Sequence, residues 1–528
     1  MKNRALVSVA FTLACIFSAC SDGKDSAGGT TEGTNALAIV DKDISGVTQK
    51  GPFIKGSPVT VLELEEKTLK QTGRAFRGKV TDNGNFIVKG LNLESNYAIL
   101  EANGYYWNEI TGEKSKAPIT LNAIADISDR ENVNINLLTQ LEYERVLQLV
   151  EKDSLSVSEA KKQAKKEILK AFFYSNDSLD FEDLNIFESG EGDALLLAAS
   201  IMILAGNTEA ETTELLYDVA EDMENGKIDN DSTQATIADR VAFDLDVAKI
   251  RKNIQKWEMS DSIPAFENFI ENFWANQYKL GTCDKDSEGK IKKNGNKLSQ
   301  YVSTNFLCKD GHWKAIYYNP DYKYDTITDK RDGQTYRTTK IGNQVWMAEN
   351  MKYKPKGANE ITACYDDKEA NCDKYGFLYD LNAALVSCPE GFRIPSESDW
   401  KELADLLGGD SIAGPKLRAI GGWNTTQFPS TLKDKDEYGF SALPAGVHFF
   451  GGFGSITYFW TDHVVYRDGA LLGAYNIAIS DGDRMEFGGN ALTTTKISLR
   501  CIKGEKKVEE PKKDSEEAKA DSSEASEK

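Results

Sequence analysis

The spacing of apolar residues changes along the chain and separates two kinds of predicted structure. Between about Asp41 and Ser128, short apolar runs typical of β-strands alternate with turn residues. One such turn, Asp82-Asn83-Gly84-Asn85, favours a tight hairpin because Asn and Gly accept positive φ angles. We therefore expect a small antiparallel β-sandwich. Its predicted strands cover residues 44–47, 59–64, 75–80, 86–88 and 97–102.

From residue 137 to residue 277 the spacing becomes helical and predicts a bundle of five to seven helices. Ser156 and Glu159 form the capping-box pattern ahead of one of these helices. Either Asn207 or Thr208 suits the start of another helix. Since a bundle needs helices with one apolar face, this segment is expected to bury its own core.

Three further signals refine the helical region. Pro264 fits the first turn of a late helix, because that position needs no backbone N–H. Residues 194–205 are the most hydrophobic internal stretch but are far too few to span a bilayer, so they predict a buried helix. Asp229-Asn230-Asp231 resembles the start of a calcium loop but lacks the later Gly and Glu, and a solvated turn is the expectation.

The N-terminal residues have the layout of an export signal. Lys2 and Arg4 precede a weakly polar to apolar stretch that ends at Ala19. The tetrapeptide FSAC that follows resembles the lipobox of bacterial lipoproteins, in which the cysteine, here Cys20, is acylated. Cys15 fits the spacing less well, and ordinary signal-peptide cleavage nearby is the alternative. We expect an exported chain held by its lipid to the bacterial outer membrane or cell surface.

Composition narrows the possible partners. The chain has 528 residues, more than one hydrophobic core usually serves. Its formal net charge is −20, which repels phosphate backbones and makes nucleic acid an unsuitable partner. The segments 20–40 and 504–528 are polar and lack an apolar period, so we expect a disordered linker and a disordered charged tail.

Six cysteines remain when Cys15 and Cys20 are set aside. An even number in an exported chain indicates disulfides, although six cysteines allow fifteen connectivities. Zinc is the competing interpretation, but the sequence has no Cys-x-x-Cys and its three histidines are scattered. The pairing that we expect is Cys283 with Cys308, Cys364 with Cys372, and Cys388 with Cys501.

Spaced motifs in the C-terminal third resemble one known family. They are DKRDGQTYRTTKIGNQVWMAENM from Asp329, CPEGFRIPSESDW from Cys388, GFSALPAG from Gly439, FW ending at Trp460, and RC ending at Cys501. Together they resemble the Fibrobacter succinogenes major paralogous domain of surface lipoproteins. The resemblance implies a fold similar to C-type lectins and formylglycine-generating enzymes, with two helices on a small irregular sheet.

Local signals agree with that expectation. Ser396 and Asp399 suit the start of a helix that Gly408-Gly409 ends. The resemblance also implies that Cys388 and Cys501 form the long staple of the domain. The chain departs from the family pattern at Leu381 and in Thr461-Asp462-His463. The helix is expected to face inward through Trp400, Leu403, Leu406 and Leu407.

Candidate ligand-binding residues follow from short motifs. Trp460-Thr461-Asp462 resembles the calcium motif of sugar-binding lectins, but its partner tripeptide is absent, so no cofactor is expected and bound calcium is the alternative. Glu349 and Asn350 are either a polar ligand pair or a buried hydrogen-bonding turn. The aromatic run 105–107 either stacks on a sugar ring or caps the sandwich core. The candidates are Trp460, Asp462, Tyr458, Glu349 and Asn350.

Two classes of function fit these signals. The first is binding or adhesion, with polysaccharide or another surface component held by the C-terminal domain. The second is a structural or assembly component of the cell envelope that binds other envelope proteins and no small ligand. We expect no enzymatic activity, because no grouping of Ser, His and Asp or reactive cysteine has supporting context.

The overall expectation is a multidomain α+β chain. The segments GPFIKGSPVTVLEL, TDNGNFIVKGL and ANGYYWNEITG resemble prealbumin-like or carboxypeptidase-regulatory-like modules. The predicted segments are a signal peptide (1–19), a lipidated cysteine with linker (20–40), the β-sandwich (41–130), the helical bundle (131–280), a disulfide-linked connector (281–318), the paralogous domain (319–503) and the charged tail (504–528).

Overall fold

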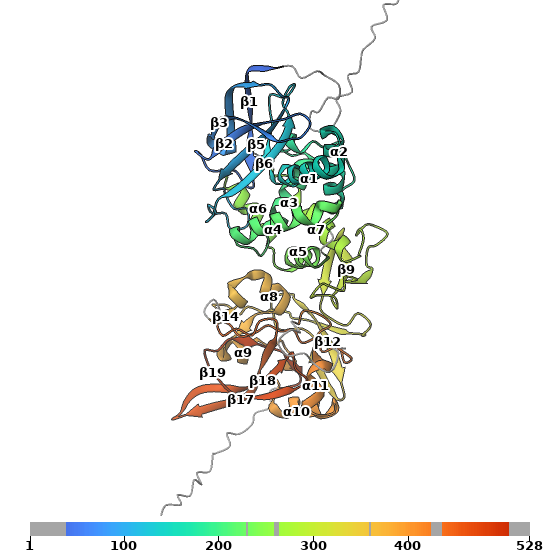
Figure 1. The fold of residues 1–528 in the computed structure, drawn as a ribbon. Helices are drawn as coiled ribbons and strands as arrows, with labels where there is room; N and C mark the ends of the chain where they lie inside the picture. Colours follow the sequence, from blue (N-terminus) through green and yellow to red (C-terminus); the bar gives the residue numbers. More distant parts are fainter. Residues whose placement is uncertain (1–37, 229–230, 258–262, 358–360, 424–435, 506–528) are drawn as a thin grey trace, which may run out of the picture. The chain divides into compact units, whose positions relative to one another are not determined.

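The computed structural model describes residues 38–228, 231–257, 263–357, 361–423 and 436–505. The predicted signal peptide, Cys20, Asp229 and Asn230 lie outside these residues, as do nearly all of the predicted linker and tail. The chain divides into two compact units, Met1–Trp274 and Ala275–Lys528 (Figure 1). It is a mixed α+β protein with several sheets and three disulfides, in agreement with the predicted class.

One seven-stranded sheet forms the β-region of the first unit, in the order β6-β5-β2-β3-β4-β1-β7. Neighbouring strands are antiparallel except for β1 and β7. The sequence identified five of the strands but neither β6 nor β7, and β1 begins two residues inside the predicted linker. The strands are β1 (Ile39–Gln49), β2 (Pro58–Leu64), β3 (Gln71–Val80), β4 (Asn85–Leu93), β5 (Tyr97–Gly104), β6 (Ile119–Asp126) and β7 (Ile135–Asn136).

The predicted turn between β3 and β4 is confirmed. A short 3₁₀ segment, Asp82–Gly84, joins the two strands, with φ of 60° at Asn83 and 77° at Gly84. A Cβ atom at Gly84 would lie 2.7 Å from the carbonyl oxygen of Thr48. Glycine is therefore required at this position both by its φ angle and by the close approach of β1.

Within the described residues, seven helices follow the sheet, a number in the range expected from the sequence. They are α1 (Leu137–Asp153), α2 (Val157–Ala171), α3 (Glu191–Leu204), α4 (Glu209–Asp222), α5 (Asp231–Phe243), α6 (Val247–Gln255) and α7 (Phe266–Gln277). The capping box of Ser156 and Glu159 is present at α2, and Thr208 caps α4. Pro264 lies two residues ahead of α7, so its predicted place in the first turn is wrong.

Burial explains where the helices lie. Every residue of α3 from Gly192 to Leu204 is buried, as the apolar run predicted. The helices α1 and α2 pack on β2, β5 and β6 in a cluster that includes Ile99, Ile124 and Val146 (Figure 1). Within the described residues, only the pair α3 and α4, bent by 113°, has the length and apolar character of a membrane span, and no single helix does.

Lys161 of α2 connects these helices to the sheet although it is fully buried. Its Nζ donates to the carbonyl oxygen of Ile124 on β6 at 2.7 Å, to Glu142 of α1 at 2.6 Å, and to Glu182. Burial raises the pKa of Glu142, while the nearby ammonium opposes this shift. The helices α1 and α2 and the strand β6 therefore meet at one buried cation. Its removal would leave the carboxylates of Glu142 and Glu182 buried without a counter-charge.

The second unit contains three small sheets. Their orders are β10-β9-β8, β11-β12-β13-β21-β16 and β14-β15-β20-β17-β18-β19. The strands are β8 (Ile291–Lys293), β9 (Asn305–Lys309), β10 (His312–Ile316), β11 (Asp325–Thr328), β12 (Thr335–Ile341), β13 (Gln344–Met347), β14 (Thr362–Ala363), β15 (Leu378–Tyr379), β16 (Phe392–Arg393), β17 (Ile456–Arg467), β18 (Ala470–Ser480), β19 (Met485–Leu492), β20 (Ile497–Ser498) and β21 (Ile502–Lys503).

Four helices accompany these sheets: α8 (Glu369–Tyr375), α9 (Leu381–Ser387), α10 (Glu397–Leu406) and α11 (Asp410–Leu417). Ser396 and Asp399 form the predicted capping box of α10. Trp400, Leu403 and Leu407 are buried as expected, but Leu406 is 48 % exposed, so its predicted inward orientation is wrong. Its position falls beyond the edge of the buried helical face.

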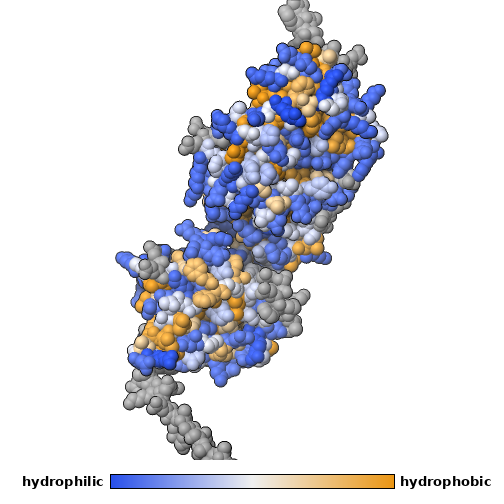
Figure 2. Space-filling view, turned by 60° about the vertical axis from the view of Figure 1, so that its left-hand side comes forward, coloured by the Kyte–Doolittle hydropathy of each residue, from blue (hydrophilic) through white to orange (hydrophobic). Residues whose placement is uncertain are grey.

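An aromatic cluster forms the centre of the second unit. Trp346, Trp400, Phe440 and Phe459 are buried together, and the rings of Trp346 and Trp400 lie 4.6 Å apart between centroids. Aromatic side chains bury large areas and prefer tilted contacts of this kind. Outside this core, Figure 2 shows hydrophilic residues over much of the visible face, with apolar residues in separate smaller areas.

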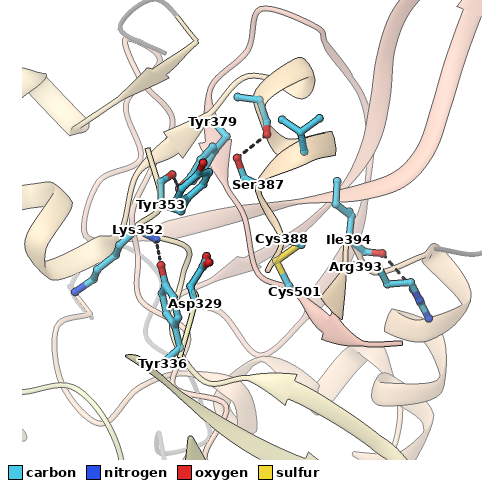
Figure 3. The surroundings of a disulfide bond; sticks show 12 residues. Asp329, Tyr336, Lys352, Tyr353, Tyr379, Ser387, Cys388, Arg393, Ile394 and Cys501 are labelled. Carbon is cyan, nitrogen blue, oxygen red and sulfur yellow. Dashed lines mark hydrogen bonds between the residues drawn. A yellow bond between two sulfur atoms is a disulfide. The ribbon is translucent and has the colours of Figure 1, made fainter. Parts of the chain in front are cut away.

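The three disulfides have the predicted pairing. Cys283 bonds Cys308, Cys364 bonds Cys372, and Cys388 bonds Cys501. Figure 3 shows the last of these bonds close to Arg393 and Ile394. Cys388 directly follows α9, and Cys501 directly precedes β21. The bond therefore ties a helix end to the last strand of a sheet.

Replacing both Cys388 and Cys501 by alanine is expected to lower the unfolding free energy of the second unit by about 4 to 5 kcal/mol, because the bond joins residues 113 apart. The matched replacement of Cys364 and Cys372, 8 residues apart, should cost about 2 to 3 kcal/mol. Denaturant unfolding followed by tryptophan fluorescence measures both losses. Equal losses would contradict this loop-closure account.

Candidate functional site

A cavity of about 580 Å³ lies in the second unit. Its walls come from the residues 314–318 in and after β10, from Arg337 of β12, from the turn 348–352 after β13, and from residues 370–376 of α8 and its C-terminus. This volume is within the range of small-molecule sites. Leu307, Ser441, Leu443 and Arg500 complete the lining, so the cavity brings together segments that are distant in the sequence.

Cations cover the faces of the tyrosines in this cavity. The Nζ of Lys374 lies 4.3 Å from the ring centroid of Tyr317 and 4.8 Å from that of Tyr375. The guanidinium carbon of Arg337 lies 4.1 Å from the ring centroid of Tyr318. Burial raises the pKa of Tyr317 well above its usual value, so its hydroxyl stays protonated. Cation–π contacts hold these charges against the walls.

Glu349 faces Arg337 across the cavity wall. Its Oε1 lies 2.9 Å from Nη2 of Arg337, and its Oε2 accepts a hydrogen bond from the backbone N–H of the same residue at 2.8 Å. One carboxylate thus binds both the side chain and the strand of Arg337. Its remaining role is to orient the guanidinium that stacks on Tyr318.

Asn350 and Arg500 form the buried floor. Oδ1 of Asn350 accepts hydrogen bonds from Nε and Nη2 of Arg500 at 3.0 and 2.7 Å, while its Nδ2 donates to the carbonyl oxygen of Tyr375 at 2.8 Å. Arg500 also donates to the carbonyl oxygens of Phe440 and Ser441. Burial lowers the pKa of Arg500 to about 9. These groups are occupied within the protein and support the walls.

Asp436 lies behind this floor. Its carboxylate accepts hydrogen bonds from the N–H and hydroxyl of Ser441 at 2.7 and 2.6 Å and from the N–H of Asn319 at 3.2 Å. Burial raises its pKa to about 6, and these hydrogen bonds together with Arg500 oppose the shift. The group therefore takes up a proton in mildly acidic solution.

The predicted site residues fall into two sets. Glu349 and Asn350 both line the cavity, and Asn350 also matches the alternative of a buried hydrogen-bonding turn. Trp460 was predicted as a ligand contact, but it is fully buried and its indole N–H donates to the carbonyl oxygen of Tyr379 at 2.8 Å. Its ring is therefore a core element, and this interpretation is corrected. Neither Tyr458 nor Asp462 lines the cavity; both are half-buried in β17.

The aromatic run 105–107 of the first unit was expected either to cap the core or to be available for stacking on a sugar, and its residues divide between the core and the surface. Tyr106 is buried and its ring stacks on Phe53 with centroids 6.3 Å apart. Tyr105 and Trp107 are 40 % and 41 % exposed. The middle residue therefore fills the core, while its neighbours remain at the surface.

The six cysteines in the described part of the chain offer no open metal site. Among the described residues, Cys283, Glu288 and Cys308 form the one group of potential ligands close enough to share an ion. Both sulfurs belong to the Cys283–Cys308 disulfide. Cysteine binds a metal as its thiolate, so this group does not suit one while the disulfide is intact.

Sequence reasoning missed the residues that give the cavity its charge. Arg337 stands inside one of the family motifs, and Tyr317-Tyr318 and Lys374-Tyr375 are visible as tyrosines next to each other or to lysine. Those patterns are common at surfaces. Only their convergence in space distinguishes them here.

The comparison with protein families identifies part of the second unit. Residues 339–503 match the Fibrobacter succinogenes major domain. This supports the predicted paralogous domain and includes Glu349, Asn350, Tyr375 and Arg500 of the cavity, while Tyr317, Tyr318 and Arg337 precede the match. No curated protein matches the sequence. Part of the second unit is thus similar to this domain, and residues ahead of the match also line the cavity.

The variant Asp436→Asn is expected to remove a pH dependence from the stability of the second unit. The carboxyl has a pKa of about 6 when folded and an ordinary value near 4, so between these values the folded state binds the proton more tightly. As the pH falls from 7 to 4, the unfolding free energy of the wild type should therefore rise by about 2 kcal/mol relative to that of the variant. Urea unfolding at several pH values measures the difference.

The exposed Asp321 supplies the matched control, because Asp321→Asn should leave the wild-type pH profile unchanged. A constant stability difference between wild type and Asp436→Asn over this pH range would contradict the assignment.

Proposed function

We propose that this chain is an exported lipoprotein, anchored through Cys20 to the outer membrane or cell surface, that binds a saccharide or another surface component in the cavity of its second unit. The Lys2–Ala19 pattern and the lipobox resemblance support export and lipidation. Three disulfides also suit an oxidising compartment outside the cytosol. The proposal includes no enzymatic step and no resident cofactor.

The observation that carries the binding role is the cavity itself. It has the volume of a ligand site, polar groups converge on it from several segments, and hydrogen bonds within the protein already fix its floor at Asn350 and Arg500. A preformed site loses little conformational entropy when a ligand enters. A binding module therefore explains this arrangement better than a purely structural role.

We also propose a C-type-lectin-like fold for the second unit. The last strand, β21, pairs between β13 and β16, and the long disulfide fixes the residue before it to the end of α9. These features support the fold that the family resemblance implies. The first unit would then act as a spacer between the anchor and the binding domain.

A specific observation favours a second function, the assembly with other envelope proteins. Phe449 and Phe450 are adjacent and 80 % and 81 % exposed. Large apolar side chains exposed together are typical of surfaces that contact another molecule. In this alternative the loop that holds them is the contact, and the cavity is not used.

Obstruction of the cavity tests the binding function. Ala370 is exposed on α8 and lines the cavity, so Ala370→Trp should block entry with little effect on folding. In the soluble Cys20→Ser form, Ala370→Trp is expected to bind glycan columns at least about tenfold more weakly. This corresponds to a loss of roughly 1.4 kcal/mol of binding free energy. Ala210→Trp, on an exposed position of α4, is the matched control and should bind normally.

Retention that Ala370→Trp leaves intact would remove the cavity from the proposal. Two results together would favour the assembly role instead. The unmodified chain would not be retained on glycan, and replacement of Phe449 and Phe450 by serine would remove the envelope proteins that co-purify with it.

Lipidation is tested separately by labelling cells with an alkyne fatty acid. The wild-type chain and Cys15→Ser should both take up the label and remain in the membrane fraction, whereas Cys20→Ser should do neither. Stable anchoring needs two or more acyl chains, and Cys20→Ser removes the residue that starts their attachment. The variant should therefore be absent from the membrane fraction. Label that persists in Cys20→Ser would contradict the anchor.

A further inference from the structure

The cavity of the second unit is cationic although the chain as a whole carries a net charge of −20. Five cationic side chains line it, against two carboxylates. The cations are Lys314, Arg337, Lys352, Lys374 and Arg500, and the carboxylates are Glu349 and Asp373. A concave site with the opposite sign to the rest of the chain focuses its field on ligands of the other charge.

The pairing of these groups shows which charges a ligand can meet. Arg500 is committed to the floor, Glu349 is paired with Arg337, and Nζ of Lys314 lies 3.6 Å from the carboxylate of Asp310. Lys352 donates from Nζ to the backbone carbonyl oxygen of Asp373, not to a carboxylate. In this contact the charge of Lys352 meets only the dipole of a backbone carbonyl and no negative charge. An anionic ligand could therefore still approach the ammonium group.

The tyrosine faces point to the same conclusion. In a site for neutral sugars, a ring face is bare and stacks on the sugar. Here Lys374 covers faces of Tyr317 and Tyr375, and Arg337 covers a face of Tyr318. What the walls present on these faces is therefore ammonium and guanidinium. Cations held against aromatic rings are partly desolvated and bind an anion more strongly than they would in water.

We propose that this cavity binds acidic saccharides, whose carboxylate or sulfate groups contact Lys352, Lys374 and Arg337. The proposal rests on the binding function above and adds the class of ligand. The cations lie on two walls of the cavity: β12 forms one, and α8 with the turn after β13 forms the other. This spacing fits negative groups carried by one sugar ring or by successive rings. A volume of about 580 Å³ also suits sugar rings better than a single small anion.

Polygalacturonate oligomers and their methyl esters test the charge directly, because the two probes share rings and linkages and differ in the carboxylate. The full chain with Cys20→Ser should bind the acid form at least tenfold more tightly by calorimetry. Binding should weaken as sodium chloride rises from 50 to 500 mM, since exposed charges are screened. Dextran sulfate and neutral dextran form a second pair that extends the comparison to sulfate.

Single substitutions locate the contact. Lys374→Gln and Lys352→Gln should each weaken binding of the acid form about three- to tenfold, and Lys374→Arg should restore it. Lys330→Gln is the matched control, because Lys330 is exposed elsewhere and pairs with Glu390. Thermal unfolding of each variant verifies that the second unit still folds.

The outcomes separate this inference from the binding function. Equal binding of acid and ester, abolished by Ala370→Trp, would overturn the acidic class and leave the binding function in place. Preference for the acid form that persists in Lys374→Gln and Lys352→Gln would also overturn it. Failure of all charged and neutral glycans to bind would overturn the acidic-saccharide class together with the saccharide part of the binding function.

Discussion

Much of the second unit depends on one buried cation, the guanidinium of Arg500. Its desolvation is severe enough to lower its pKa, so the charge persists only because acceptors surround it. Oδ1 of Asn350, which is 150 residues away in the sequence, and the carbonyl oxygens of Phe440 and Ser441 supply them. The guanidinium also lies over the rings of Phe440 and Phe459. One side chain thus joins the aromatic core to the cavity floor.

Local features of the fold were predictable from the sequence because they depend on neighbouring residues. The capping boxes of α2 and α10 need only two residues three positions apart, and the buried helix α3 needs only an apolar run. The expected disulfide pairing agreed as well, although the six cysteines other than Cys15 and Cys20 left fifteen connectivities open. The strands β6 and β7 were missed because the sheet, more than their own pattern, stabilises them.

The site was less predictable for a physical reason. Glu349 and Asn350 could be proposed because polar residues three and four positions after a core tryptophan, Trp346, need hydrogen-bond partners. Trp460 was misinterpreted because a motif cannot show which face of β17 points into the core. Tyr318, Arg337 and Lys374 come from three separate segments, and only tertiary packing places their charges and rings together. The sign of a local field can therefore oppose the sign of the whole chain.

The long disulfide also has a consequence for biogenesis. In a chain that crosses a membrane from its N-terminus, Cys364, Cys372 and Cys388 emerge well before Cys501, because 113 residues separate the last two. Early closure of the eight-residue Cys364–Cys372 loop leaves Cys388 as a lone thiol that must wait for its partner. Any premature bond between Cys388 and an earlier cysteine would have to be reshuffled by thiol–disulfide exchange. If the chain is exported as proposed, maturation of this domain would be paced by the arrival of its final strand.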